Sequence, residues 1–432
     1  MNITINRSEL SDAVSRAAAI APASSPVREL EGVMLETDAA AKTLTVTATN
    51  LEIALEQRVP CETAEDDALV VNASLFDAML KKLAGDTAKL HRRTDDPYLT
   101  IEGGEAAYCL PALERKNFPN MEVAFPEDTI SVTGIPAMVR RSAFAVSAQG
   151  SDPLLKCVNL RFTKDGLVAV GSDGLRLVSA KGDQKSTGNV SLLVPAASLN
   201  VLARISSDKD EYRVGTTGKK IVFSKPNLIY SARIVEEEYV DTDRIISYLQ
   251  NAFTVLTDIS ELRNAMDTVM PVDPGGSVCL SFNGDRLTLA AKGAFGSAAT
   301  TVGVTPLRGM PQGQYWQTSK KLYECFKALS GTATLGVAQN GILTLSTEEA
   351  FYMQPSVRPP KPKAEPKPEE KTETEGCRHD AAGNRRKQQA PLRADPLCRL
   401  RQLSNGCLCT RQTQRRGQDL RCRNLSERGH RL

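Results

Sequence analysis

The stretch LTVTATNLEIALEQRV, at residues 44–59, alternates apolar and polar residues around a small turn, as the two strands of a hairpin do. The pattern returns as LVAVGSDGLRLVSAKG at residues 167–182 and as LTLAAKGAFGSAATTV at residues 287–302. The three copies lie about 122 residues apart. A repeat of this length is too long for a solenoid, so the pattern predicts three similar domains.

Two sets of helices recur with the same period. The first set lies at residues 8–21, 136–148 and 258–270, where apolar residues recur every three to four positions. The second set lies within residues 70–85, 193–208 and 315–331, each time after a strand end and a small or polar capping residue. We therefore predict an α+β fold of three repeats, each with two helices and several antiparallel strands. The predicted domains are residues 1–127, 128–250 and 251–358.

The composition separates an acidic body from a basic tail. The chain has 432 residues and a net charge of +3. From Cys377 onward, thirteen Arg and one Lys stand against four acids, whereas residues 1–358 carry a net charge of about −6. A linker of Pro, Lys and Glu at residues 359–376 lies between them. Because no apolar run is long enough to span a membrane and no secretory pattern opens the chain, we expect a cytoplasmic protein that makes no membrane contact.

The tail at residues 377–432 has no aromatic residue and no Ile, Val or Met, so we predict that it is disordered. One alternative is a zinc site, although the spacing of the candidate ligands is not that of a zinc knuckle. Its ligands would be His379, Cys398, Cys407, Cys409 and Cys422. Another alternative is that the tail is a frame-shifted or unselected extension.

Deletion of residues 360–432 is expected to leave the folding and any self-association of the body unchanged, and to lower only nonspecific affinity for polyanions such as DNA. The reason is that the tail carries charge but no residues that could complete a core. Gel filtration and DNA binding of the truncated chain test this, and a truncated chain that fails to fold or that loses the self-association of the full chain would refute it.

The body lacks the motifs of common catalytic sites. It has no phosphate-binding glycine loop, no H-E-x-x-H motif and a single histidine, His91. Its five cysteines are isolated in sequence. We therefore expect a binding protein, with no catalytic residue, no metal and no cofactor. Basic residues do recur on the polar faces of the helices in all three repeats, either as ordinary solvated side chains or as one surface for a polyanion.

Several short segments resemble, in order, those of the bacterial DNA polymerase III beta subunit family, the sliding clamps. The most specific is VGSDGLRLVSA, at residues 170–180, which resembles the T-D-G-x-R-L segment of the family. YCLPALERKNFPNM (108–121) resembles its L-P-x-x-x-F-P segment, and SARIVEEEYVDTDRII (231–246) resembles a later segment more distantly. AFYMQPSVRP (350–359) resembles the family's C-terminal strand. The resemblance covers about residues 1–358 and implies the DNA clamp fold.

The resemblance implies that two chains close head to tail into a ring around duplex DNA. The implied protein is a processivity factor, a non-catalytic subunit of the DNA polymerase III holoenzyme. Its implied partners are duplex DNA, a second copy of the chain, the DNA polymerase III alpha subunit, the clamp loader and other clamp-binding replication or repair proteins. The implied DNA contacts are Arg16, Lys81, Lys82, Arg140, Arg141, Gln149, Arg204, Lys320 and Lys321.

The resemblance also implies a cleft that binds a short client peptide, and a dimer interface. The cleft residues would be Cys157, Ser172, Gly174, Leu175, Arg176, Leu177, Val240, Arg244, Ile245, Met353, Gln354, Pro355, Val357 and Arg358. The interface residues would be Tyr108, Leu110, Val269 and Met270. Two alternatives stay open: an accessory or decoy clamp that the host replisome does not load, and an enzyme with a nucleic-acid-binding tail, which the missing catalytic motifs disfavour.

Overall fold

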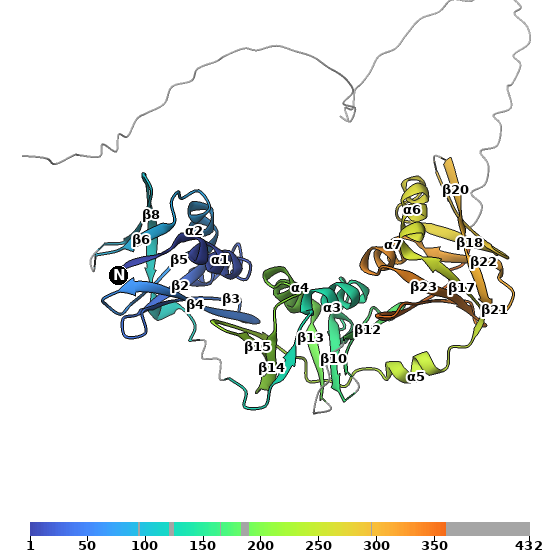
Figure 1. Cartoon of the computed structure of the whole chain (residues 1–432), viewed down its shortest axis with the longest axis horizontal. Helices are drawn as coiled ribbons and strands as arrows, with labels where there is room; N and C mark the ends of the chain where they lie inside the picture. Colours follow the sequence, from blue (N-terminus) through green and yellow to red (C-terminus); the bar gives the residue numbers. More distant parts are fainter. Residues whose placement is uncertain (94–95, 121–124, 165, 183–189, 295, 360–432) are drawn as a thin grey trace, which may run out of the picture. The chain divides into compact units, whose positions relative to one another are not determined.

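The computed structural model describes residues 1–93, 96–120, 125–164, 166–182, 190–294 and 296–359 (Figure 1). Every described strand pair is antiparallel. The longer helices pack in pairs, α1 with α2, α3 with α4 and α6 with α7. The predicted α+β fold is therefore confirmed.

One order of elements occurs three times: a strand, a helix, four strands, a helix and three strands. The first run is β1 (Asn2–Asn6), α1 (Arg7–Ala18), β2 (Gly32–Asp38), β3 (Thr43–Thr49), β4 (Ile53–Thr63), β5 (Asp67–Asn72), α2 (Ala73–Leu80), β6 (Thr87–His91), β7 (Tyr98–Gly103) and β8 (Ala106–Glu114). The second run is β9 (Ile130–Val132), α3 (Ile135–Ser142), β10 (Cys157–Thr163), β11 (Gly166–Ser172), β12 (Leu177–Gly182), β13 (Val190–Pro195), α4 (Ala196–Ile205), β14 (Tyr212–Thr217), β15 (Lys220–Lys225) and β16 (Leu228–Arg233).

The third run follows a short helix, α5 (Thr242–Ser247), and contains one extra strand, β21. It is β17 (Asn251–Asp258), α6 (Ile259–Val269), β18 (Ser277–Asn283), β19 (Arg286–Gly293), β20 (Gly296–Gly303), β21 (Thr305–Arg308), β22 (Gln312–Thr318), α7 (Ser319–Ala328), β23 (Thr332–Ala338), β24 (Ile342–Ser346) and β25 (Ala350–Pro355). The predicted domain limits near residues 127 and 250 fall between β8 and β9 and between α5 and β17.

The first helix shows how the sequence sets these elements. Its N-cap is Asn6, whose side chain accepts a hydrogen bond from the amide of Glu9 at 3.1 Å. Leu10, Ala13, Val14 and Ala17 form its buried stripe, which packs against the sheet. Asn72 and Asp258 cap α2 and α6 in the same way.

Helix α3 is shorter than the sequence pattern predicts. The pattern continues to residue 148, but the α-helix ends at Ser142 and a 3₁₀ turn follows at Ala143–Ala145. In that turn the carbonyl of Phe144 accepts a hydrogen bond from the guanidinium of Arg176. This contact comes from a residue distant in sequence, so helical periodicity could not reveal it.

The repeats join edge to edge through their strands. Strand β4, the third strand after α1, pairs with β16, the last strand of the second run. In the same way β12, the third strand after α3, pairs with β25, the last strand of the third run. Tyr230 faces Leu55 in the first junction and Tyr352 faces Val178 in the second, and all four side chains are fully buried.

One third strand and one last strand, β20 and β8, are not joined to another repeat within the described chain. Strand β20 is the third strand after α6, and it pairs only with β19 at the edge of a four-stranded sheet. Strand β8 is the last strand of the first run; residues 106–111 pair with β7, and β5 joins only residues 112–114. Each junction between repeats uses the third strand of one repeat and the last strand of the next. After the two junctions inside the chain, β20 and β8 are the third strand and the last strand that remain without such a partner.

Candidate functional site

Four of the eight cations predicted to meet DNA line two recesses between helices of different repeats, namely Arg16, Arg204, Lys320 and Lys321. Arg16, in the last turn of α1, and Arg204, in the last turn of α4, line one recess together with Lys225. Arg16 also donates a hydrogen bond to Gln57 at 3.2 Å. Two helices from different repeats thus present cations to the same space.

A second recess, of about 690 Å³, joins the predicted residues Gln149, Lys320 and Lys321. Lys320 and Lys321 are in the first turn of α7, and Gln149 follows the 3₁₀ turn after α3. The recess also holds Lys156 and Asn200, which the sequence analysis did not include. Its lining is rich in donors for phosphate oxygens.

The predicted cations differ in whether they are already paired. Lys81 pairs with Asp77 at 2.6 Å and Arg140 with Asp208 at 2.8 Å, while Arg141 pairs with Glu349. The Arg140 hydrogen bond and charge lower the pKa of Asp208. Three other cations are exposed and make no ion pair within the described residues, so they are free to meet phosphates: Lys82, Arg204 and Lys320.

The turn at residues 172–177 lies at the centre of the predicted peptide cleft. Gly174 has φ of +82°, which favours glycine, and its amide donates to the Ser172 hydroxyl at 3.1 Å. The Ser172 hydroxyl in turn donates to the carbonyl of Arg176 at 2.8 Å. The turn projects Leu175, whose residue is 61% exposed, while Leu177 is buried and paired with Met353.

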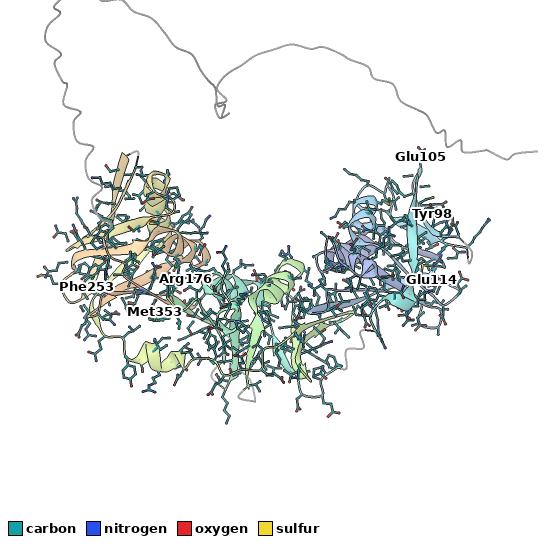
Figure 2. The ribbon with its side chains drawn as sticks, turned by 180° about the vertical axis from the view of Figure 1, so that it is seen from behind. Tyr98, Glu105, Glu114, Arg176, Phe253 and Met353 are labelled. Atoms are coloured by element: carbon teal, nitrogen blue, oxygen red, sulfur yellow. The ribbon has the colours of Figure 1, made fainter. Side chains whose placement is uncertain are left out.

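Arg176, which the resemblance implies as a cleft residue, is turned toward helix α7. The residue is only 5% exposed. Its guanidinium pairs with Glu324 on α7 at 2.7 Å and with Asp173 at 3.2 Å, and it stacks over the Phe144 ring at 5.4 Å. Figure 2 labels Arg176 and Met353. Phe144 stacks in turn on Tyr352 of β25. Arg176 therefore holds the turn to the junction between the second and third runs.

Arg176→Ala is expected to lower the free energy of unfolding by about 1–3 kcal/mol, because it removes the charged hydrogen bonds of a buried guanidinium to Glu324 and Asp173, and leaves Asp173 with Lys321 alone. Urea denaturation followed by circular dichroism measures this change. Arg244→Ala is the matched control, because Arg244 is exposed and its loss is expected to change stability by less than about 0.5 kcal/mol. Equal stabilities of the two variants would refute the structural role of Arg176.

The other predicted cleft residues come from two segments. Val240 and Ile245 are exposed apolar residues before and within α5, where Arg244 lies over the ring of Tyr248. Pro355 is half-buried, Gln354 is buried, and Val357 and Arg358 are exposed. Val357 forms a backbone hydrogen bond with Trp316 of β22. Exposed apolar side chains thus occur on the turn, on the segment around α5 and at the end of the described chain.

Cys157 and Tyr239 form a buried part of the same region. The Cys157 thiol donates to the carbonyl of Pro153 at 3.3 Å, and burial, with a smaller effect from Glu237, raises its pKa to about 11. Burial, followed by the neighbouring Cys157, raises the pKa of Tyr239 to about 12. Tyr239 therefore lies near Cys157, the first residue of β10. The sequence analysis did not include Tyr239 as a site residue.

The residues predicted for the dimer interface divide into two kinds. Leu110 and Val269 are fully buried in the cores of their own repeats, so they cannot form a new contact surface. Tyr108 and Met270 are only half-buried. Tyr108 lies on the open part of β8, and the matching open strand is β20, which the sequence analysis did not identify as an edge.

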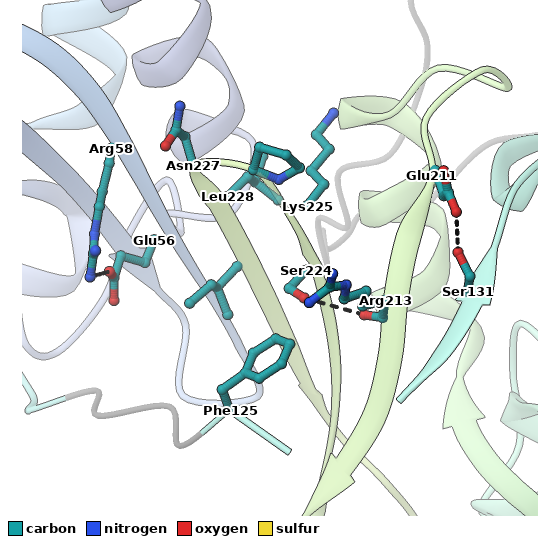
Figure 3. Close-up of a pocket in the computed structure, with 12 residues that line it drawn as sticks. Glu56, Arg58, Phe125, Ser131, Glu211, Arg213, Ser224, Lys225, Asn227 and Leu228 are labelled. Atoms are coloured by element: carbon teal, nitrogen blue, oxygen red, sulfur yellow. Dashed lines mark hydrogen bonds and ion pairs between the residues drawn. The ribbon is translucent and has the colours of Figure 1, made fainter. Parts of the chain in front are cut away.

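A recess away from all these residues lies where β4 meets β16, and it holds about 610 Å³ (Figure 3). Phe125, Arg213 and Glu211 are among its lining residues, and none of the predicted site residues lines it. Within the described residues, no group of three His, Cys, Asp or Glu side chains gathers as a metal site would require. None of the described helices is long and apolar enough to cross a membrane. The proposed zinc ligands and the tail lie outside the described residues.

Comparison with known proteins agrees with this architecture. Residues 1–122 match the N-terminal domain of the DNA polymerase III beta subunit, and residues 129–241 match its central domain. The beta sliding clamp of Bacillus subtilis is 23% identical over 282 residues, which span 62% of this chain and 73% of that protein. The beta sliding clamp of Staphylococcus epidermidis is 27% identical over 224 residues, which span 49% of this chain and 59% of that protein.

Solved structures share the fold at low sequence identity. The sliding clamp of Bacillus subtilis superposes with a TM-score of 0.76 at 18% identity, covering 83% of this chain and 99% of that one. The clamp of Pseudomonas aeruginosa bound to griselimycin gives 0.75 at 20% identity, with coverage of 83% and 99%. The two family domains together match more than half of the 432 residues. The chain therefore belongs to the DNA polymerase III beta subunit family, the beta sliding clamps, whose members are non-catalytic processivity factors of DNA replication.

Proposed function

We propose that two copies of this chain close head to tail into a ring that encircles duplex DNA, slides along it and tethers the replicative polymerase. The observation that carries the proposal is the pair of open strands, β8 and β20. An unpaired edge is a template for another chain, and joining each open β20 to the β8 of a second copy leaves neither edge free. Each chain then contributes three domains to the ring, at residues 1–127, 128–250 and 251–358.

The two strand junctions inside the chain supply the register of the proposed junction between β8 and the β20 of a second copy. Tyr230 faces Leu55, Tyr352 faces Val178, and the three tyrosines Tyr108, Tyr230 and Tyr352 are each 122 residues apart. When the three hairpins at residues 44–59, 167–182 and 287–302 are aligned, Ala298 takes the position of Leu55 and Val178. In the dimer, Tyr108 therefore faces Ala298 of the partner subunit. Tyr108 and Ala298 are half-buried in the single chain, whereas their counterparts are buried.

The ring would hold DNA by topology, with weak contacts from the helix cations. Lys82, Arg204 and Lys320 are free to meet phosphates. The recess lined by Arg204 has no aromatic or amide side chain, and the recess lined by Lys320 has Phe144, Gln149 and Asn200, so contacts to phosphate are favoured over base reading. Such contacts carry no sequence preference and let the ring slide. The proposed partners are the DNA polymerase III alpha subunit, the clamp loader and other replication or repair proteins. The proposed place of binding is the cytoplasm.

The client cleft lies between the 172–177 turn, the α5 segment and Met353. It offers exposed apolar side chains for a short peptide that carries a glutamine and two apolar residues. Griselimycin bound to the Pseudomonas aeruginosa clamp supports the presence of a ligand site on this fold. Arg176 would shape the cleft from behind, and Leu175, Val240 and Met353 would contact the client.

Met353→Ala is expected to weaken binding of such a peptide about 5- to 30-fold, since it removes a half-buried side chain from the cleft wall. Fluorescence anisotropy of the labelled peptide measures the change. Met310→Ala is the matched control, because Met310 is an exposed methionine outside the predicted cleft. Unchanged affinity in the Met353 variant, or an equal loss in the Met310 variant, would remove Met353 from the site.

Loading onto nicked circular DNA tests the ring directly. A sliding ring is retained on the circle in high salt and is released when the circle is cut, because topology and not contact holds it. A dimer that forms but is never loaded by a replicative clamp loader would instead support the accessory or decoy clamp. A monomer that binds circular and linear DNA alike would refute the proposed function.

A further inference from the structure

An ion pair joins the helix proposed to meet DNA to the turn proposed to meet client peptides. The ammonium of Lys321, on α7, lies 2.9 Å from Oδ2 of Asp173 in the 172–177 turn. The Asp173 side chain is 9% exposed, whereas that of Lys321 is 25% exposed. Both residues line the recess that also holds Lys320 and Gln149, and the lysine is the more exposed end of the pair.

Asp173 in turn holds the shape of the turn. Its Oδ1 accepts the amide hydrogens of Leu175 at 3.0 Å and of Arg176 at 2.9 Å. Burial alone would raise the pKa of this carboxyl, but the backbone hydrogen bonds and Lys321 together lower it. Asp173 is thus a charged anchor, and Leu175, the most exposed apolar residue of the turn, depends on it for its position.

A second ion pair fastens the same turn to the same helix. Arg176 pairs with Glu324, one turn along α7 from Lys321, and also donates to the carbonyl of Lys321 at 3.2 Å. Arg176 is only 5% exposed and already holds two carboxylates, so an outside anion has less access to it than to Lys321. Of the two anchors, the Lys321–Asp173 pair therefore exchanges its anion more readily for one in the recess.

We propose that a DNA phosphate and Asp173 compete for the ammonium of Lys321, so that duplex DNA in the ring loosens the 172–177 turn of the client cleft. The inference rests on the proposed DNA and client surfaces. Two anions that share one ammonium repel each other, so a phosphate contact weakens the hold on Asp173. By linkage, a client that fixes the turn weakens the grip of Lys321 on DNA, and the ring slides more freely when its client is bound.

A double-mutant cycle on a short linear duplex tests the competition at low salt. Asp173→Asn removes the internal competitor and is expected to tighten binding of the duplex about two- to fivefold, the range of a partly exposed ion pair. In the Lys321→Gln background the same change is expected to have no effect, because the lysine that it frees is gone. A tightening that persists in that background would show that Asp173 acts through its charge at a distance, and would overturn the proposal.

Hydrogen exchange of the peptide covering residues 172–177 gives a second readout that does not need Asp173→Asn to fold. Addition of the duplex is expected to speed exchange of the Leu175 and Arg176 amides in the parent chain and to leave it unchanged in Lys321→Gln. Lys320→Gln is the control, because Lys320 is exposed and has no ion-pair partner among the described residues. It is expected to weaken DNA binding but keep the change in exchange.

The outcomes separate the inference from the function on which it rests. If the parent chain binds no duplex at all, the proposed function fails and the competition fails with it. If the duplex binds but exchange at residues 172–177 does not respond, the competition is refuted and the ring stands.

Discussion

Tyr108→Glu is expected to convert the dimer into monomers at micromolar concentration. Tyr108 would lie at the centre of the strand pair that joins β8 to β20 of the partner subunit, where loss of a central aromatic costs about 2–3 kcal/mol. A closed ring of two chains contains two such junctions, so the dissociation constant is expected to rise about 10³- to 10⁴-fold. Sedimentation equilibrium measures the change.

The same substitution at Tyr98 provides the control. Tyr98 is an exposed tyrosine on β7, a strand that is paired on both sides, with β6 and with β8. Tyr98→Glu is expected to leave the dimer intact. Because Tyr108 is only half-buried within its own chain, its replacement should also leave the monomer folded. A dimer that survives Tyr108→Glu would exclude β8 from the interface.

Replacing Lys82, Arg204 and Lys320 together by glutamine is expected to remove most of the salt dependence of binding to linear duplex DNA. The three changes remove six cations from a ring of two chains, and each phosphate contact contributes about −0.9 to the slope of log affinity against log salt. If all six make contact, the parent loses about 10³-fold in affinity between 50 and 200 mM salt, and the variant far less. Retention on closed circles should barely change in either protein.

A charge-matched variant separates contact from net charge. Lys42, Arg286 and Arg308 are exposed cations on strands or turns away from the helices. Their replacement by glutamine removes the same charge and is expected to preserve the salt slope. If both triple variants changed the slope equally, the helix cations would not be the DNA contacts.

The sequence predicts the elements of this fold well, because periodicity is a local property. The three hairpins and the six longer helices lie where the alternating and helical patterns place them, except that α3 ends at Ser142, before the end of its pattern. The sequence also carries the register of the interface, since Tyr108, Tyr230 and Tyr352 recur every 122 residues. That spacing predicts a register only once the structure shows that Tyr230 faces β4 and Tyr352 faces β12.

The sequence could not predict the directions of side chains at the junctions. Arg176 follows a glycine turn and matches a family motif, yet it points toward α7 because Glu324 and the carbonyl of Phe144 meet it there. These partners are 148 and 32 residues away, and no local pattern links them. Leu110 lies on the open strand β8 but faces inward, since strand alternation places it on the same face as Tyr108 and deeper in the core.

A disulfide between Cys109 and a cysteine placed at residue 297 tests the ring most directly. The proposed register sets Cys109, which is exposed, opposite Ser297 of the partner subunit, and the Cα atoms of facing residues in antiparallel strands are about 4.5–5.5 Å apart, within the range of a disulfide. The five tail cysteines are first replaced by serine. The account predicts that Ser297→Cys gives a covalent dimer under mild oxidation that stays on circular DNA in denaturant, while Ala299→Cys, two residues along β20, crosslinks poorly. No crosslink at residue 297, or equal crosslinking at residues 297 and 299, would contradict the account.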